Sequence, residues 1–495
     1  MLYHGLKPPL GRCCDQNQEE GSAMSEGQFY HLIDGKLETS EDSFPVINPA
    51  TEEPFATCPK ATKAQLDQAV AAARRAQKQW RKTSFAERRE VIERFAAKLQ
   101  ESADILAPIL TREQGKPLAE ARVEIMRSGV SAREICSVEI KPELMKEDAK
   151  GRIELHYRPL GVIGGITPWN VPIVLAAPKL ASALYAGNAF ILKPSPYTPL
   201  TTLKMGELIK DIFPPGLVSI IAGGDEFGQW MTEHPGIDKI SFTGSVPTGK
   251  KVVESGARSM KRITLELGGN DAAIVLSDAD PKEIAPRVFA AAFALSGQVC
   301  MAIKRLYVHE SIYEDMVGEM TKIAEKAKFG EGFEEGVQYG PIQNKMQYDK
   351  VLGILEDTKN LPDVRITTGG HALNRKGYFV APTIVADIKE GTRLVDEEPF
   401  GPVLPILSFK DVDDVVERAN NSRFGLGGSV WTKDIDKGSE IAGQLEAGVV
   451  WVNHHIGLSR EFPFGGAKES GMGRQGHAIG VKSDMEPQVV VLPAK

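Results

Sequence analysis

The two residues of this chain best suited to chemistry are a cysteine and a glutamate. Cys300 lies in the stretch ALSGQVCMAIKR, among small and apolar residues. Since a lone cysteine usually behaves as a small buried hydrophobe, this stretch by itself favours a structural thiol. Glu266 lies in the apolar frame LEL beside two glycines, where burial would raise the pKa of its carboxylate into a range that suits a general base.

Four more polar residues are candidates, although each alone has a common structural explanation. An asparagine after a strand is usually a turn residue, and a lysine or glutamate is usually a solvated charge. No histidine close to Cys300 in the sequence supports a Cys–His hydrolase. The four residues are Asn170, Lys179, Lys193 and Glu398.

Composition excludes several classes of function. The 495 residues, 42% hydrophobic and 25% charged, predict a folded protein of two or three lobes, without an apolar run that could cross a membrane. A net charge of -7 gives no general attraction to nucleic acid. The five cysteines form no metal-ligand spacing, and their odd, sparse set predicts a reducing, cytoplasmic location. Residues 1–23 lack the apolar segment of a secretory signal and are expected to form a loose tail.

The hydrophobic pattern predicts an α/β fold. Two packing helices are expected to open the ordered region, the second with a capping box at Ser84 and Glu87. From Leu160 onward, short β-rich runs alternate with helical stretches, which predicts a parallel sheet with crossover helices. A second segment of this kind starts near Ile263, and the alternation of apolar residues around Leu155 predicts a hairpin.

Two motifs resemble nucleotide-binding loops. GMGRQG (471–476) fits G-x-G-x-x-G but follows a loop near the end of the chain, so the strand and helix that the motif needs are missing. GSVPTGKK (244–251) has Lys251 where a P-loop has serine or threonine, which disfavours a nucleoside triphosphatase. It does follow a strand and precede a helix, so its backbone N–H groups could hold a pyrophosphate; an ordinary βα loop is the alternative.

Seven blocks in order make the sequence resemble the aldehyde dehydrogenase superfamily. They are PWN (168–170), LKPS (192–195), FTGS (242–245), LELGGN (265–270), GQVC (297–300), EEPFGPV (397–403), and VWVN with PFGGAKESGMGR (450–474). The resemblance implies a Rossmann-like dinucleotide-binding lobe at 24–140 and 160–265 and a Rossmann-like catalytic lobe at 266–470. It also implies a β-hairpin oligomerisation element at 141–159 and 480–495.

The resemblance implies that an aldehyde is oxidised to a carboxylic acid. Cys300 matches the family nucleophile, Asn170 and the Cys300 N–H match the oxyanion site, and Glu266 matches the residue that activates water against the thioester. Lys179 remains available to the proton network around Glu266. Two alternatives stay open: an acyl-transferring branch that uses coenzyme A or phosphate, and a non-catalytic structural or binding protein on this fold.

NAD is the implied cofactor, and no metal is expected. In the family a glutamate is common at the position of Pro196, where it repels a 2'-phosphate, so NADP is also possible here. Leu295 and Gln475 are further departures, from a usual asparagine and a usual glutamate. The expected partners are a small aldehyde and further copies of the chain, in a homodimer or homotetramer. The residues expected at the cofactor are Thr167, Pro168, Trp169, Lys193, Ser195, Pro196, Gly224, Gly228, Phe242, Thr243, Gly244, Ser245, Leu267, Gly268, Glu398 and Phe400.

Overall fold

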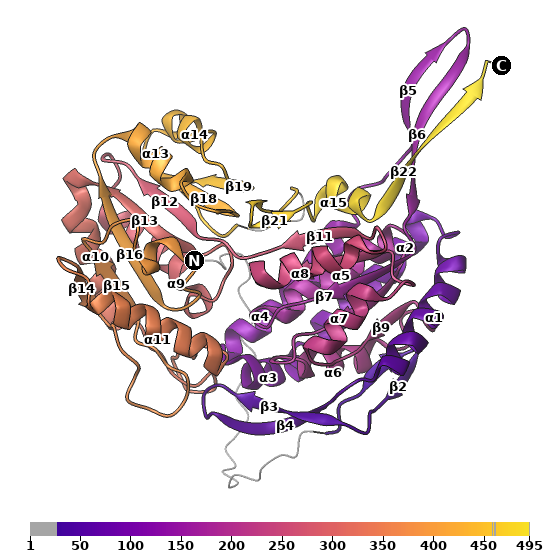
Figure 1. Cartoon of the computed structure of the whole chain (residues 1–495), viewed down its shortest axis with the longest axis horizontal. Helices are drawn as coiled ribbons and strands as arrows, with labels where there is room; N and C mark the ends of the chain where they lie inside the picture. Colours follow the sequence, from indigo (N-terminus) through magenta and orange to yellow (C-terminus); the bar gives the residue numbers. More distant parts are fainter. Residues whose placement is uncertain (1–26, 458, 460–461, 495) are drawn as a thin grey trace, which may run out of the picture.

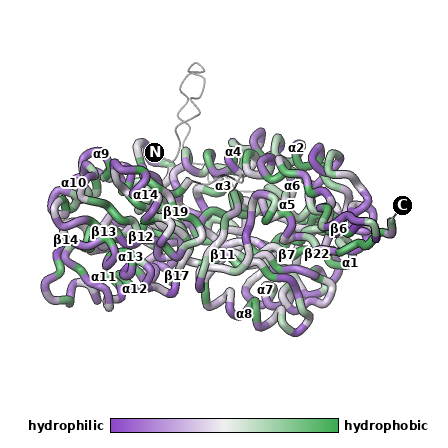
Figure 2. The backbone as a smooth tube through the Cα atoms, turned by 90° about the horizontal axis from the view of Figure 1, so that it is seen from above, coloured by the Kyte–Doolittle hydropathy of each residue, from purple (hydrophilic) through white to green (hydrophobic). Residues whose placement is uncertain are grey.

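Two β-sheets form the centres of two lobes that lie side by side along the long axis of the molecule (Figure 1). The view turned by 90° shows the same division, with β11 (Arg262–Glu266) and β19 (Val449–Val452) near the middle (Figure 2). The computed structural model describes residues 27–457, 459 and 462–494, so the tail expected at 1–23 lies outside the described residues. The predicted α/β class with parallel sheets is confirmed.

The first sheet has eight strands, and its five central strands are parallel. From β7 the chain winds one way to β8 and β9, and then returns to β10 and β11 on the other side. The carboxyl ends of β7 and β10 therefore form a topological switch point, where such sheets bind ligands. The spatial order is β2 (Lys36–Glu38), β1 (His31–Ile33), β9 (Val218–Ile220), β8 (Ala189–Lys193), β7 (Val162–Ile166), β10 (Lys239–Thr243), β11 and β21 (Gly471–Met472).

Helices cover both faces of this sheet. Because βαβ crossovers are right-handed, the reversal of winding puts α5 and α6 on one face and α7 and α8 on the other, and the members of each pair contact each other. The predicted capping box at Ser84 and Glu87 is confirmed at the start of α2. The helices are α1 (Lys63–Trp80), α2 (Phe85–Glu101), α3 (Ala103–Gln114), α4 (Leu118–Ile135), α5 (Pro172–Tyr185), α6 (Leu200–Ile209), α7 (Asp225–Glu233) and α8 (Val246–Ala257).

The second sheet has seven strands, all parallel except the edge strand β14. Alternate residues of its strand β12 enter two different hydrophobic cores, Ala273 and Val275 on one face and Ala272 and Ile274 on the other. This sheet is therefore buried on both faces, as a parallel sheet requires. The spatial order is β14 (Arg365–Thr368), β15 (Thr383–Ala386), β16 (Val403–Phe409), β13 (Ile303–His309), β12 (Asp271–Val275), β18 (Gly427–Trp431) and β19.

The helices of the second lobe connect these strands, and α9 leads directly into the cysteine loop through a short 3-10 turn, η1. They are α9 (Pro281–Phe293), η1 (Ala294–Gly297), η2 (Glu310–Ile312), α10 (Tyr313–Lys326), α11 (Lys345–Lys359), α12 (Arg393–Asp396), α13 (Val412–Asn420) and α14 (Ile435–Ala442).

A three-stranded arm projects from the first lobe beside the carboxyl end of the described chain (Figure 1). The predicted hairpin is confirmed, and the terminal strand pairs with it along nine residues. Its elements are β5 (Glu143–Asp148), β6 (Gly151–Pro159) and β22 (Met485–Pro493), and α15 (His477–Ser483) leads into it. Two small pairs complete the described structure, β3 (Ser43–Asn48) with β4 (Glu53–Pro59) and β17 (Phe424–Gly425) with β20 (Ala467–Lys468).

The expectation that two helices open the ordered region is wrong, because β1 to β4 precede α1. Two of these strands have only three residues, and in β3 and β4 exposed, half-buried and buried residues do not alternate regularly. None of the four therefore shows the pattern from which a strand is predicted. The nucleotide interpretation of GMGRQG stays disfavoured, because Gly471 and Met472 form an antiparallel edge strand rather than the first strand of a βαβ unit. The expectation that no helix follows the motif is wrong, since α15 begins at His477.

Candidate active site

Cys300 follows a sharp left-handed turn at the end of α9. Leu295, Ser296 and Gly297 all have positive φ angles, of 52°, 56° and 74°. A Cβ atom on Gly297 would lie 2.0 Å from the carbonyl oxygen of Gly401, so only glycine fits there. Leucine tolerates the left-handed region much less well than asparagine, which gives a physical reason for the asparagine that the family usually has at position 295.

Asn170 contacts the cysteine loop at Gln298, which lies 128 residues later in the sequence. Asn170 follows β7 at the switch point, and its Nδ2 donates to the carbonyl oxygen of Gln298 at 2.9 Å. An amide nitrogen carries two hydrogens, so this bond fixes the side chain and leaves the second hydrogen for another acceptor. The Asn170 side chain is buried, so that second hydrogen would act in a site of low polarity.

Glu266 is the last residue of β11, beside the switch point. Its neighbour across the parallel pair is Thr243 of β10, and its carbonyl oxygen accepts from the Gly244 N–H at 3.1 Å. The side chain is buried, and a Cβ atom on Gly465 would lie 3.2 Å from its Oε1. The carboxylate thus lies between the first sheet and the loop that precedes β20.

Lys179 and Gln475 meet at one hydroxyl group. The Lys179 Nζ and the Gln475 Nε2 both donate to the Ser241 Oγ, at 3.1 and 3.2 Å. All three side chains line a small polar cavity of about 20 Å³, which is enough for roughly one water molecule. A neutral amide at position 475 therefore joins this network as a donor, whereas a carboxylate could only accept.

The expected cofactor residues gather at the carboxyl ends of the parallel strands. Thr167 and Pro168 follow β7, and the Thr167 N–H donates to the carbonyl oxygen of Lys193, the last residue of β8, at 3.1 Å. Ser195 is buried, and its Oγ accepts from the Tyr197 N–H, while Pro196 is half-buried in the same loop. Phe242 and Thr243 end β10.

The turn after β10 has the form expected of a pyrophosphate loop. Ser245 is the N-cap of α8, and its side chain accepts from the Thr248 N–H. A Cβ atom on Gly244 would lie 2.5 Å from the ring of Phe242, so a side chain at this position would displace the ring. Leu267 is buried against α8, where a Cβ atom on Gly249 would lie 2.7 Å from its side chain.

Three further contacts join expected cofactor residues from separate segments of the chain. The rings of Trp169 and Phe400 meet edge to face with centroids 5.4 Å apart. A Cβ atom on Gly268 would lie 2.2 Å from the Oε2 of Glu398, so the carboxylate packs directly on the glycine backbone. Between α7 and β8, a Cβ atom on Gly228 would lie 3.6 Å from the side chain of Lys193.

The carboxyl ends of the parallel strands carry an open helix start and polar groups that suit a dinucleotide. Gly224 is the N-cap of α7, and a Cβ atom there would meet no atom within 4 Å, so the start of this helix is open. Within the described part of the chain, the buried hydroxyl oxygens of Thr167 and Thr243 have no hydrogen-bond partner. Open helix starts and unused hydroxyls at a switch point suit phosphate and ribose groups.

Comparison with known proteins decides the family. The model of the aldehyde dehydrogenase family matches residues 37–490. This chain belongs to the aldehyde dehydrogenase family. A mitochondrial aldehyde dehydrogenase of Leishmania tarentolae is 38% identical over 91% of this chain and 91% of its own. Aldehyde dehydrogenase 1A1 of Mesocricetus auratus is 38% identical over 94% and 93%.

Solved structures agree with this assignment. The NAD+ complex of a Bacillus cereus aldehyde dehydrogenase is 34% identical, with a TM-score of 0.92 over 96% of this chain and 98% of its own. Betaine aldehyde dehydrogenase of Staphylococcus aureus in complex with NAD+ is 30% identical, with a TM-score of 0.89 over 95% and 96%. The protein is an NAD(P)-dependent aldehyde dehydrogenase.

Within residues 27–457, 459 and 462–494, no helix is long and apolar enough to cross a membrane. Over the same ranges, no group of three or more histidine, cysteine, aspartate or glutamate side chains is arranged to hold a metal ion.

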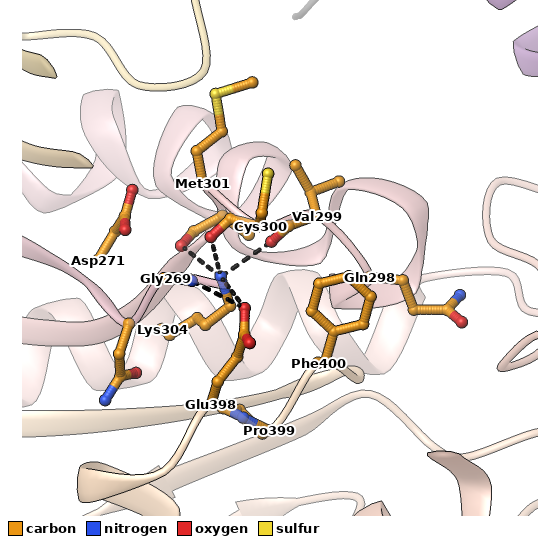
Figure 3. Close-up of polar contacts among 12 residues, drawn as sticks. Gly269, Asp271, Gln298, Val299, Cys300, Met301, Lys304, Glu398, Pro399 and Phe400 are labelled. Carbon is orange, nitrogen blue, oxygen red and sulfur yellow. Dashed lines mark hydrogen bonds and ion pairs between the residues drawn. The ribbon is translucent and has the colours of Figure 1, made fainter. Parts of the chain in front are cut away.

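Sequence reasoning missed Lys304, which lies directly behind the cysteine loop of the dehydrogenase (Figure 3). The side chain is buried, and its Nζ donates to the carbonyl oxygen of Cys300 at 2.5 Å. A lysine inside the otherwise apolar run CMAIK was the available signal, because buried lysines require partners.

The Cys300 thiol is partly buried against the core of the second lobe. Burial raises the pKa of the thiol to about 12, and the carboxylates of Glu398, Asp271 and Glu266 act in the same direction, while the Lys304 ammonium lowers it. Without substrate and cofactor, the thiol should therefore be protonated at neutral pH.

We expect the rate of Cys300 alkylation by iodoacetamide in the cofactor-free enzyme to keep rising with pH up to about 10. A thiol with a raised pKa gains about tenfold in thiolate for each pH unit below that pKa, whereas an ordinary cysteine levels off near 8.5. Mass spectrometry of the Cys300 peptide gives the rate, and the same peptide in unfolded protein is the control. A plateau below pH 8 in the folded enzyme would contradict the expected environment.

Proposed function

We propose that the enzyme oxidises its aldehyde through a covalent thioester on Cys300, which water then hydrolyses. The strongest support is the bond from the Asn170 amide to the carbonyl oxygen of Gln298, 2.9 Å long and two residues before the cysteine. It brings an amide donor of the first lobe to the cysteine loop of the second lobe, where an aldehyde oxygen would need it.

The first step is the attack of the Cys300 sulfur on the aldehyde carbon, after the thiol has lost its proton to water. The second hydrogen of the Asn170 amide and the Cys300 N–H are proposed to donate to the oxyanion that results. Fixed donors of this kind typically lower the barrier by about 3 kcal/mol each. The resulting thiohemiacetal carries the hydrogen that must leave as hydride.

Nicotinamide dinucleotide, when bound, supplies the hydride acceptor. We propose that Gly244 and Ser245 hold its pyrophosphate, Lys193 its adenosine ribose and Glu398 its nicotinamide ribose. Trp169 and Phe400 would pack at the nicotinamide end. NAD+ is the cofactor in the complexes of the Bacillus cereus and Staphylococcus aureus relatives, and we propose it here as well.

Glu266 is proposed to accept a proton from the water that hydrolyses the thioester. Its support is its position, buried at the end of β11 beside the switch point. Water attack returns the Cys300 thiol and releases a carboxylic acid. This role disfavours transfer of the acyl group to coenzyme A or phosphate, since an activated water would consume the thioester first.

Two substitutions test the covalent route. Cys300→Ala should abolish aldehyde-dependent reduction of NAD+ while NAD+ still binds, because only the nucleophile is removed. Glu266→Gln should give one burst of NADH, about equal to the enzyme present, followed by turnover at least 100-fold slower, because the thioester forms and stalls. Stopped-flow absorbance measures both, with Glu335→Gln, at an exposed glutamate, as the matched control. An Ala variant that turns over normally, or a Gln variant without a burst, would refute these roles.

Both NAD and NADP should serve as cofactor. Pro196 offers no carboxylate against a 2'-phosphate, and the nearby Lys193 ammonium, whose pKa burial lowers to about 8, is still mostly charged at pH 7. We expect kcat/KM for the two cofactors to agree within tenfold, about 1.4 kcal/mol. Pro196→Glu should lower kcat/KM for NADP at least tenfold and leave that for NAD within threefold. A wild-type preference beyond tenfold would contradict the proposal.

We propose that the arm joins copies of the chain. Both edge strands of its sheet, β5 and β22, are open, and the arm stands away from the lobe (Figure 1). It also exposes large apolar side chains, which in a monomer would be costly: Leu144, Met145, Val489 and Val491, each exposed by 57% to 70%. A homodimer or homotetramer would cover them.

Sedimentation velocity should therefore give a mass of at least twice 53.9 kDa. Val491→Asp should shift the protein toward the monomer, because a charge would be buried at the contact. Met260→Asp is the matched control, since Met260 is 80% exposed and lies outside the arm. A monomeric wild type, or equal dissociation by both variants, would refute the arm contact.

We also propose that the enzyme works in the cytosol. The described cysteines Cys58, Cys136 and Cys300 form no disulfide. Relatives include cytosolic aldehyde dehydrogenases of Mus musculus and Elephantulus edwardii, as well as the mitochondrial one of Leishmania tarentolae.

A further inference from the structure

Lys304 binds the two carbonyl groups that precede and follow the Cys300 N–H. Its Nζ donates to the carbonyl oxygens of Val299 at 2.9 Å and of Cys300 at 2.5 Å. The same ammonium lies 3.4 Å from the Oε1 of Glu398. Its side chain is 3% exposed, so these groups replace the water that the charge loses. Figure 3 shows all these contacts converging on one nitrogen.

These two carbonyl contacts fix the direction of two N–H groups. In a trans peptide the C=O and the following N–H point in opposite directions. Because the Val299 and Cys300 carbonyls point toward Lys304, the N–H groups of Cys300 and Met301 point away from it. The Cys300 sulfur also lies on the far side of the loop from the ammonium (Figure 3). Lys304 therefore turns the N–H donors toward the side on which the thiol lies.

A second side chain holds the next carbonyl independently. The Nε2 of His455 lies 2.9 Å from the carbonyl oxygen of Met301, and as the nitrogen is the donor it carries the proton. The ring is buried, and its Nδ1 lies 2.8 Å from the Ser429 Oγ. The carbonyls from Gln298 to Met301 thus all accept from buried side chains, which leaves little freedom for the loop to rotate.

Glu398 connects this arrangement to the cofactor side of the crevice. Its Oε1 accepts from the Gly269 N–H at 3.1 Å and faces the Lys304 ammonium. The carbonyl oxygen of Glu398 in turn accepts from the Lys350 Nζ at 2.7 Å. One carboxylate oxygen therefore touches both the glycine turn after β11 and the lysine behind the nucleophile.

We propose that Lys304 is a positioning residue that orients the N–H donors of the nucleophile loop and joins them electrostatically to Glu398. The inference rests on the proposed function for the roles of the Cys300 N–H and Glu398. A substitution at either Lys304 or Glu398 then changes the ionisation and the reactivity of the Cys300 thiol, even when neither cofactor nor substrate is present.

The charges facing the thiol set the sign of the effect. Lys304 is the cation that lowers the pKa of Cys300, and Glu398, Asp271 and Glu266 raise it. Removal of the ammonium leaves the three carboxylates unopposed and should disfavour the thiolate. Removal of the Glu398 charge leaves the ammonium less compensated and should favour it.

Opposite substitutions test the pair in the cofactor-free enzyme. Lys304→Gln should lower the iodoacetamide rate of Cys300 at least threefold between pH 8 and 9.5, and Glu398→Gln should raise it at least threefold. With aldehyde and NAD+, Lys304→Gln should also lower kcat at least tenfold, and Lys304→Arg should recover part of both losses. Unchanged alkylation in both Gln variants, or shifts of the same sign, would overturn the inference.

Lys239→Gln is the matched control for the loss of a buried ammonium. Lys239 is equally buried and also donates to a carbonyl oxygen, that of Ser483, and to a carboxylate, that of Asp484. Both lysine variants should lower the melting temperature, but Lys239→Gln should leave the Cys300 alkylation rate within twofold. If Lys304→Gln does not fold, Glu398→Gln, which keeps the shape of its side chain, still decides the sign.

The outcomes separate this inference from the proposed function. Alkylation needs neither aldehyde nor cofactor, so a wild-type enzyme that fails to oxidise any aldehyde refutes the function and leaves the Lys304 measurement valid. A wild type that oxidises aldehydes while both Gln variants alkylate normally refutes the role of Lys304 alone.

Discussion

The site depends on a few residues of backbone being held in one orientation between the two lobes. In a trans peptide the C=O and the next N–H point to opposite sides. If the backbone N–H groups of the cysteine loop face the substrate side, the carbonyl oxygens of the same peptides face the protein interior and need hydrogen-bond donors there. The Lys304 ammonium is that donor for the carbonyl oxygens of Val299 and Cys300. The fold of the second lobe matters to the chemistry mainly because β13 brings this lysine behind the loop.

Glycines let the two lobes approach closely enough for that arrangement. Gly268 packs on the Glu398 carboxylate, Gly269 lies against the carbonyl oxygen of Cys300, and Gly297 lies against that of Gly401. Any side chain at these positions would push segments of different loops apart. The glycines of LELGGN and SGQVC therefore act as contact points, and only Gly297 also has the positive φ angle that favours glycine.

Burial shifts the pKa values of the acidic and basic groups of the site in opposite directions, and a neighbouring charge of opposite sign opposes each shift. It raises the pKa of Glu398 and of Cys300, so both favour their neutral forms, and the Lys304 ammonium opposes both shifts. On the cofactor side, burial lowers the pKa of Lys193, and the Asp225 carboxylate opposes it. A dry site strengthens every remaining electrostatic contact, which is the condition under which two N–H donors can stabilise an oxyanion.

The sequence by itself determined the α/β class, the hairpin and the candidate residues around Cys300, because hydrophobic periodicity and short glycine-rich blocks are local properties. It did not reveal the strands before α1, which are too short or too irregular in burial to show a periodic pattern. Nor could it show why leucine at position 295 is unusual, since a left-handed turn is visible only in the backbone. The tertiary structure alone decided that Asn170 meets Gln298, that Lys179 and Gln475 share Ser241, and that Lys304 lies between Cys300 and Glu398. Most of those contacts join segments far apart in the chain, and only the packing of strands, helices and loops brings them within hydrogen-bonding distance.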